Sequence, residues 1–552
     1  MSPSPEVHGR LPGRYRLALL LLAAVALVLA WRGMTEAARP DPWFDNLDSN
    51  LHDAVDALAI NSSIAPVRTD QPGLTSKYLL ALDYRIRHFS GVLPVWNLKK
   101  LGGHPDPIQV LPELILLSRT HARILVLLFI VATAGLMHAV MRSLETTMLS
   151  LILLAASSGL LFHGVVSRPE LLCVWFGTVV APACAWQATA KGGAGARPGW
   201  LFLAGLATGL AALTKLAGGC YLLSLYGWCW VAARVEEHPA APVSRNRRLA
   251  GIVLPVGSSA VMFWLLFRLD LVSGIMADVT LARLRVAAAL VGTLPLLLLW
   301  TDRRRPGEFL RHRALELAWI VGGVLAAIGL AFGALRAVMA APAALTYLAR
   351  VLELVVHPDP VLQYLMPLSP QLTLELQHFV MELPFLLAGT TVAAWAAMLA
   401  RSAPLRLRIL IGLLWFNGIA MMLFVARSGY QEFLGLLAEV PLLLLCPLSL
   451  LALGVWRPRV PGSGPHWAVP PILTGVAVIL LTVSLRLDLK CRSAQTEIAP
   501  PLRPQSITFL YNHDVHPERY RQIMSQHYGN RENFTAALRR YLADPANRPD
   551  SR

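Results

Sequence analysis

The stretch LALLLLAAVALVLAW, Leu17–Trp31, contains no charged or strongly polar residue, and Arg14 and Arg16 come just before it. A helix needs about 20 apolar residues to cross the roughly 30 Å hydrocarbon core of a bilayer, so this run has the composition of a membrane span. Similar blocks recur along the 552 residues, which are 55% hydrophobic and only 15% charged. This excess of apolar surface predicts a polytopic membrane protein.

Apolar blocks of suitable length predict an all-α membrane domain over residues 1–485, with about thirteen transmembrane helices. The expected spans are approximately residues 17–34, 120–141, 146–166, 171–190, 199–213, 216–233, 249–267, 286–300, 314–338, 379–400, 409–426, 432–454 and 468–485. The first span also fits a signal peptide, because its apolar run is short and TEAA, residues 35–38, is a suitable cleavage region. Either alternative leaves the topology of the later spans unchanged.

Basic residues gather in alternate connections between the blocks, and they set the expected orientation. The positive-inside rule places these connections and the N-terminus in the cytoplasm. Loops 35–119 and 341–378 and the tail 486–552 then lie outside, which favours a bacterial inner membrane with a periplasmic tail. Within the tail, SITFLYNHDVHPERYRQIM, residues 506–524, predicts a strand followed by a polar helix, so we expect a small soluble α/β tail.

Composition also excludes several classes of function. The net charge of +16 does not indicate nucleic-acid binding, because the lysines and arginines lie in short loops that orient the protein. The six cysteines show neither a disulfide framework nor CxxC metal spacing. The sequence contains no glycine-rich phosphate loop, the motif that would indicate binding of a soluble nucleotide. We therefore look for chemistry in the charged motifs of the outer face.

The first outer loop opens with FDNLDSNLHDAVDAL, residues 44–58, which contains four aspartates. At helical spacing the leucines share one face, and a polar face collects Asp45, Asp48, His52 and Asp56. We expect a helix on the membrane surface with its acids facing outward. Such a face is either a solvated surface or part of a reactive site.

Four further motifs place charged residues on the same side of the membrane. RTDQPGLTSKYLLAL, residues 68–82, starts a basic helix after a Pro-Gly turn, and SRPE, residues 167–170, stands at the mouth of another helix. GLATGLAALTK ends at Lys215, and RSGYQEFLGLLAEVPLL begins at Arg427. Any one of these charges also fits a side chain that snorkels to the interface. Together they predict acids and cations on one membrane face.

In this order, FDNLDS, DQPGLT, SRPE, GLATGLAALTK and RSGYQEFLGLLAEVPLL resemble the motifs of GT-C membrane glycosyltransferases, in the protein O-mannosyltransferase-like and aminoarabinose-transferase-like branch. The resemblance covers about residues 15–455 and implies a GT-C-like bundle with outer-face loop helices. The chain differs from the family in three respects. It lacks the usual Asp-Glu doublet, it has Gln71 where a histidine is usual, and it separates Arg427 from Tyr430 where an Arg-Tyr pair is usual.

The resemblance implies transfer of a hexosyl or pentosyl group from a polyprenyl-phosphate donor to a hydroxyl of a lipid, polysaccharide or protein. It assigns catalysis to Asp48, with Asp45 as the alternative, and to Glu170, which would position sugar hydroxyls. Cations stabilise a departing phosphate, so donor binding is assigned to Lys215, Arg427, Arg168 and Lys77, with Tyr430. Acceptor or sugar positioning is assigned to Asp70, Gln71 and His52. No oxygen-ligand spacing defines a metal site, and a divalent cation stays open because some related enzymes use one.

Two other functions fit parts of the sequence. A transporter or flippase for a lipid-linked sugar predicts ionisable residues near helix centres, whereas the charges here gather at the outer surface and favour an enzyme. A non-catalytic GT-C-like assembly subunit fits the missing Asp-Glu doublet. If the acidic loop is catalytic, we expect Asp48→Asn to be nearly inactive and Asp45→Asn to be impaired. Asp53→Asn and Asp56→Asn are expected to be mild.

Overall fold

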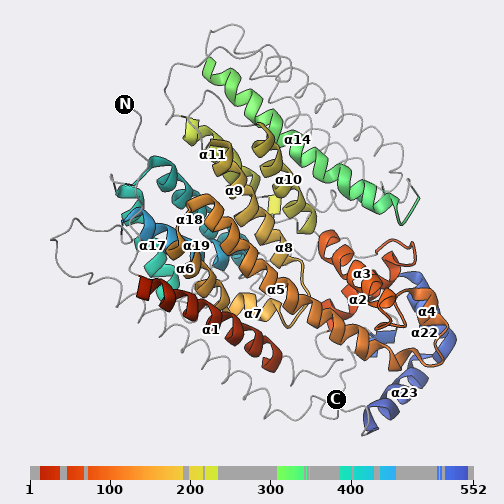
Figure 1. The fold of residues 1–552 in the computed structure, drawn as a ribbon. Coiled ribbons are helices and arrows are strands. Elements are labelled where there is room, and N and C mark those ends of the chain that lie inside the picture. Colours follow the sequence, from red (N-terminus) through yellow and green to blue (C-terminus); the bar gives the residue numbers. More distant parts are fainter. Residues whose placement is uncertain are drawn as a thin grey trace.

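The computed structural model describes residues 13–37, 47–66, 73–189, 198–215, 218–219, 221–233, 308–340, 344, 347–348, 384–400, 403–427, 436–454, 507–508, 510–511 and 516–544. In this part of the chain all regular structure is helical, and a bundle of helices has a group of shorter helices at one end (Figure 1). The helices are α1 (Gly13–Ala37), α2 (Leu47–Ile60), α3 (Leu74–Phe89), α4 (Leu98–Gly102), η1 (Pro107–Gln109), α5 (Leu111–Met141), α6 (Leu144–Ala155), α7 (Ser158–His163), α8 (Glu170–Val174), η2 (Trp175–Val180), α9 (Ala181–Thr189), α10 (Pro198–Thr214), α11 (Tyr221–Ala233), α14 (Glu308–Arg336), α17 (Pro384–Leu399), α18 (Leu405–Arg427), α19 (Leu436–Ala452), α22 (Glu518–Tyr528) and α23 (Arg531–Ala543).

Several helices have the length and composition of membrane spans. In the described part of the chain five are long and apolar enough to cross a bilayer: Tyr15–Glu36, Pro107–Met141, Glu170–Ala188, Glu316–Arg336 and Leu405–Met422. Four shorter apolar helices accompany them: Leu144–Ala155, Pro198–Thr214, Thr390–Leu399 and Leu436–Ala452. These helices support a membrane protein, but the expected number of thirteen spans stays a prediction. Three of the expected spans, 249–267, 286–300 and 468–485, lie outside the described residues.

Glycines allow α10 and α14 to approach closely. A Cβ atom added to Gly205 would lie 2.0 Å from the Ile320 carbonyl oxygen, and one added to Gly323 would lie 2.0 Å from the Phe202 carbonyl oxygen. No real Cβ atom tolerates such distances, so both positions require glycine. Apolar side chains gain little from leaving lipid for protein, and small residues therefore favour helix association by bringing backbones together.

The group of shorter helices at one end of the bundle is called the cap here; it comprises α2, α3, α4, η1, the first turns of α5, α22 and α23 (Figure 1). These elements share one apolar core, separate from the core of the bundle. Leu51 and Leu58 of α2 meet Ile523 and Phe534 of the C-terminal tail in this core. The first outer loop and the tail thus fold as one structure, although they stand at opposite ends of the sequence.

The tail differs from its expected α/β structure. No strand is present in its described residues, because residues 507–508 and 510–511 are helical, and two helices follow them where one was expected. Ile507 and Leu510 are buried in the cap core. The Tyr520 hydroxyl then donates a hydrogen bond to the Leu510 carbonyl at 2.8 Å and fixes this segment on α22.

The turn between α5 and α6 marks the end of the bundle opposite the cap. Arg142 adopts a left-handed conformation, with φ of 51°, and the Ser143 hydroxyl accepts a hydrogen bond from the Thr146 N–H at 3.2 Å. Arg16 Nη2 lies 3.2 Å from Glu145 Oε1 and ties α1 to this turn. Glu145 is therefore a buried, paired carboxylate far from the cap.

The shared core predicts that weakening the tail loosens the cap. Ile523 is fully buried, and Ile523→Ala should cost about 2–5 kcal/mol because it removes buried methyl groups and leaves a cavity. We expect faster limited proteolysis within residues 512–544, measured on purified protein in lipid. Gln526→Ala, at an exposed position of the same helix, should leave the rate unchanged. Equal rates for both variants would contradict the packing of the tail on the cap.

Candidate functional site

The polar residues of α2 are buried. Asn50, His52, Asp53 and Asp56 all lie inside the protein, and Asp56 is only 2% exposed. The expected surface helix with acids facing outward is therefore wrong for Asp53 and Asp56. The reason is that α2 packs against α3, α4 and α5 and also meets the tail, so its polar face is covered as well as its apolar face. The mild effects expected of Asn substitutions at these two aspartates no longer have a structural basis.

Two side chains of α2 hold the turn that leads into α8. Asn50 Oδ1 accepts a hydrogen bond from the Ser167 backbone N–H at 2.9 Å, and the Ser167 hydroxyl donates to Asp53 Oδ2 at 3.0 Å. Both bonds are buried, where an unmade hydrogen bond leaves a costly unsatisfied group. The first turns of α2 thereby fix the position of SRPE, residues 167–170, and bring Glu170 beneath the cap.

The turn before α3 joins the cap to the end of α10. Gly73 has a φ of 48°, in the left-handed region that glycine adopts without steric cost. Its N–H donates a hydrogen bond to the Thr214 carbonyl at 3.1 Å, and the hydroxyl oxygens of Thr75 and Thr214 lie 2.6 Å apart. Lys215 comes directly after Thr214, so these contacts also fix the backbone that carries Lys215.

Lys77, a predicted phosphate ligand, has a carboxylate partner within the cap. Its Nζ lies 2.8 Å from Asp56 Oδ2, and both side chains are buried. Burial alone would lower the pKa of Lys77, but the nearby Asp56, Tyr347 and Asp53 raise this pKa above its usual range. The charged form is therefore kept at neutral pH, and its stabilising contribution is lost only as the pH rises through the raised pKa.

The motifs SRPE and GLATGLAALTK meet at Glu170 and Lys215. Glu170 is the first residue of α8 and is 0% exposed, and its Oε1 forms an ion pair with the Lys215 ammonium. The other carboxylate oxygen, Oε2, is buried and has no hydrogen-bond partner among the described residues. An unsatisfied buried acceptor is costly, so Oε2 is suited to accept a hydrogen bond from a ligand hydroxyl. The sequence predicted both residues as site members, and the structure brings them together.

His163 and Arg168 lie near Glu170. Both side chains lie near enough to interact electrostatically with this carboxylate. His163 is buried, and its Nδ1 lies 2.8 Å from the Gly159 carbonyl oxygen. Arg168 was predicted from the sequence, whereas His163 was not. The available signal was its position in HGVVSRPE, residues 163–170, seven residues before Glu170.

The C-terminal tail reaches the other side of α2. The rings of His52 and His516 have centroids 4.7 Å apart, and the rings of His516 and Tyr520 have centroids 4.8 Å apart. His52 was predicted to position acceptor or sugar. In the structure its ring packs against the tail, and the adjacent Asp53 binds Ser167.

Another buried carboxylate belongs to α19. Glu439, in the first turn of α19, accepts a hydrogen bond from the Ser157 hydroxyl at 2.7 Å. Ser157 caps α7, the short helix that ends at His163. Ser157 thereby links Glu439 to the short helix that ends at His163, near Glu170.

Several predicted site residues are not placed by the structure. Asp45, Asp70, Gln71 and Tyr430 lie outside the described residues. The backbones of Asp48, at the start of α2, and Arg427, the last residue of α18, are described, but their side chains are not. The roles of all six stay predictions. Within the described residues, no group of three or more His, Cys, Asp or Glu side chains is placed to hold a metal ion.

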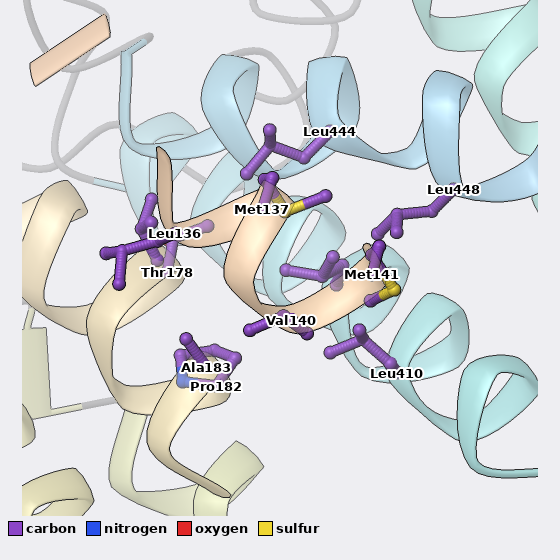
Figure 2. Close-up of a pocket in the computed structure, with 12 residues that line it drawn as sticks. Leu136, Met137, Val140, Met141, Thr178, Pro182, Ala183, Leu410, Leu444 and Leu448 are labelled. Atoms are coloured by element: carbon purple, nitrogen blue, oxygen red, sulfur yellow. The ribbon is translucent and has the colours of Figure 1, made fainter. Parts of the chain in front are cut away.

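A pocket of about 350 Å³ lies in the bundle between α5, η2, α9, α18 and α19 (Figure 2). Its wall is apolar apart from the Thr178 hydroxyl, and it includes Met137, Met141 and Leu410. Met141 is the last residue of α5, so the pocket is near the end of the bundle opposite the cap. It has no group for acid-base chemistry, so it is not the candidate site.

The pair of Lys77 and Asp56 predicts a strong effect on stability. Lys77→Met should destabilise the protein by about 3–5 kcal/mol, because it leaves the Asp56 carboxylate buried without its counter-charge. The double variant with Asp56→Leu should recover most of this loss, measured by thermal unfolding in lipid. Arg521→Met, which breaks the exposed pair with Glu518, should cost about 0–1 kcal/mol. A Lys77→Met variant as stable as wild type would show that the pair is not formed.

The candidate site thus consists of Glu170 and Lys215, with His163 and Arg168 beside them, beneath a cap that α2 and the tail build together. No protein-family model, curated protein or solved structure matches this chain.

Proposed function

We propose that the protein is a membrane glycosyltransferase, which moves a sugar from a polyprenyl-phosphate donor to a hydroxyl acceptor. The observation that supports this most is the buried Glu170 carboxylate, which is paired with Lys215 through one oxygen and has a second oxygen with no partner among the described residues. A sugar offers hydroxyl donors to such an oxygen, and a phosphate offers charge to neighbouring cations. The Glu170 carboxylate and the Lys215 ammonium are therefore adjacent, and a lipid-linked sugar phosphate offers a partner to each of them.

The roles follow from the chemistry of the transfer. A base removes the proton of the acceptor hydroxyl, the acceptor oxygen bonds to the anomeric carbon, and the bond to the phosphate oxygen breaks. We assign the base to Asp48, whose position at the start of α2 is two residues from the Asn50 contact with Ser167. Glu170 positions sugar hydroxyls. Lys215, Arg168 and Arg427 stabilise the phosphate as it leaves, since charge-assisted hydrogen bonds are stronger than neutral ones.

The position of the charges favours an enzyme over a transporter. Glu170 is at the cap-side end of a span, Lys215 follows the end of α10, and Glu439 is in the first turn of α19. A transporter moves its cargo past the bilayer centre and needs polar groups along that path. These three charged residues are instead at helix ends.

A matched pair of variants tests the proposal. The purified protein in lipid is incubated with a panel of radiolabelled polyprenyl-phosphate sugars, and release or transfer of the sugar is measured. Wild type should turn over at least one donor. Glu170→Gln should lower turnover about 10²-fold or more, because the carboxylate charge acts at the reacting sugar. Glu145→Gln, at a buried paired carboxylate of the opposite end, should retain wild-type turnover.

Other outcomes decide between the alternatives. Equal turnover in both variants would remove Glu170 from the site. Movement of intact donor between leaflets without bond cleavage, measured in vesicles, would favour a flippase. Binding of donor without release, transfer or movement would favour the non-catalytic assembly subunit.

We also propose that the N-terminus is cytoplasmic and that the cap faces the periplasm. Gly199 is exposed at the start of α10, and Thr214 at the other end of α10 contacts the cap, so Gly199 lies opposite the cap. A Gln526→Cys variant should react with an impermeant thiol reagent added outside intact cells, whereas Gly199→Cys should react only after permeabilisation. The reverse pattern would invert the orientation.

A further inference from the structure

Helix α3 has an apolar surface that no other part of the described chain covers. Leu79, Leu82, Ile86 and Phe89 follow helical spacing along one side, and their exposed fractions run from 38% for Leu79 to 79% for Phe89. These four residues are called the α3 stripe. The opposite side of α3, which includes Tyr84, packs into the cap core. An apolar row of this size on the outside of a protein marks a surface that meets something other than water.

The contact of α3 with α14 shows how deep the first turns of α3 lie relative to the bilayer. The Tyr78 hydroxyl donates a hydrogen bond to the Ala334 carbonyl at 2.8 Å. Ala334 lies near the cap-side end of the apolar span Glu316–Arg336. A helix rises about 1.5 Å per residue, so the start of this span is roughly 27 Å away, close to the thickness of the hydrocarbon core. Tyr78 is therefore at the boundary between hydrocarbon and headgroups.

The contact with α5 gives the depth of the middle of α3. Asp83 Oδ2 lies 3.5 Å from His121 Nδ1. His121 stands twenty residues before Met141, the inner end of α5, which corresponds to about 30 Å along the helix. Tyr78, measured against the span Glu316–Arg336, and Asp83, measured against α5, are thus both at the boundary between hydrocarbon and headgroups. A helix with both points at one depth lies along the membrane surface and does not project away from it.

The surroundings of the stripe have the composition of a membrane interface. The Arg85 guanidinium lies 5.5 Å from the centre of the Trp96 ring, and Lys99 and Lys100 are exposed on the next helix. Tryptophan is enriched at the level of the headgroups, and basic side chains attract anionic phospholipids. Val92, which follows α3, is another exposed apolar residue.

We infer that the α3 stripe is inserted into the cap-side leaflet of the bilayer. Its apolar side chains enter the region where acyl chains meet headgroups, and Arg85, Lys99 and Lys100 contact phospholipid phosphates. The cap is thereby held against the membrane surface by a helix that does not span it. This inference is independent of the glycosyltransferase proposal, because it depends only on the exposure of the α3 stripe and on the depth of α3 relative to the membrane spans.

Spin labels at matched positions test the inference. The six cysteines are first replaced, and Ile86→Cys, Phe89→Cys or Gln526→Cys is added singly and labelled with a nitroxide. The protein is reconstituted in vesicles of phosphatidylcholine with phosphatidylglycerol. Collision with oxygen, which concentrates in lipid, and with a water-soluble nickel chelate is measured by electron paramagnetic resonance. The ratio of oxygen to nickel collisions should be several-fold higher at positions 86 and 89 than at the exposed polar position 526.

Two results would overturn the inference. Ratios at 86 and 89 equal to that at 526 would place the stripe in water. Low collision rates with both reagents at 86 and 89 would show that protein, such as a second copy of this chain, covers the stripe.

A second measurement removes the dependence on cysteine replacement. A photoreactive phenylalanine analogue at position 89 of the otherwise wild-type chain should give phospholipid adducts by mass spectrometry after illumination in the same vesicles. The same analogue at position 526 should give none. Protein crosslinks without lipid adducts at position 89 would contradict the inference.

Discussion

The burial of α2 is the constraint on which the cap and the candidate site depend. Asn50, Asp53 and Asp56 are placed inside the protein, where each polar group needs a partner. Asn50 and Asp53 find theirs on Ser167, and Asp56 finds its partner in Lys77. These partners belong to the turn before α8 and to α3. The need to satisfy one buried helix therefore positions the segments that present Glu170 and Lys215.

The sequence predicted the membrane helices better than it predicted their surroundings. Continuous apolar runs such as those of α1 and α14 indicate a span without any knowledge of neighbours, because lipid requires them. The polar face of α2 is different. Helical spacing shows which residues share that face, but it does not show that α3 and the tail cover it. The tail segment misled for a related reason, since the sequence does not show that Ile507 and Leu510 are buried in the cap core.

The site was partly predictable because charged motifs near helix ends are visible in sequence. Glu170 and Lys215 were selected from motifs on one membrane side and from their resemblance to GT-C motifs, and they form an ion pair. Lys77 was selected by the same argument but pairs with Asp56, because sidedness does not determine which carboxylate an ammonium reaches. His163 was missed because its position seven residues before Glu170 does not by itself assign it a role. Removing one partner of such a buried pair leaves an uncompensated charge, which is strongly destabilising.

The order of synthesis has a consequence for the cap. α2 is made among the first residues of the chain, but Ile523 and Phe534, which complete its apolar core, are made among the last. At about 5–20 residues per second, translation of the intervening chain takes roughly half a minute to a minute and a half. Throughout this interval α2 lacks part of its final packing. The cap therefore reaches its final form only after α22 and α23 have been made, and a chain truncated before α22 retains its apolar spans but has an unfinished cap.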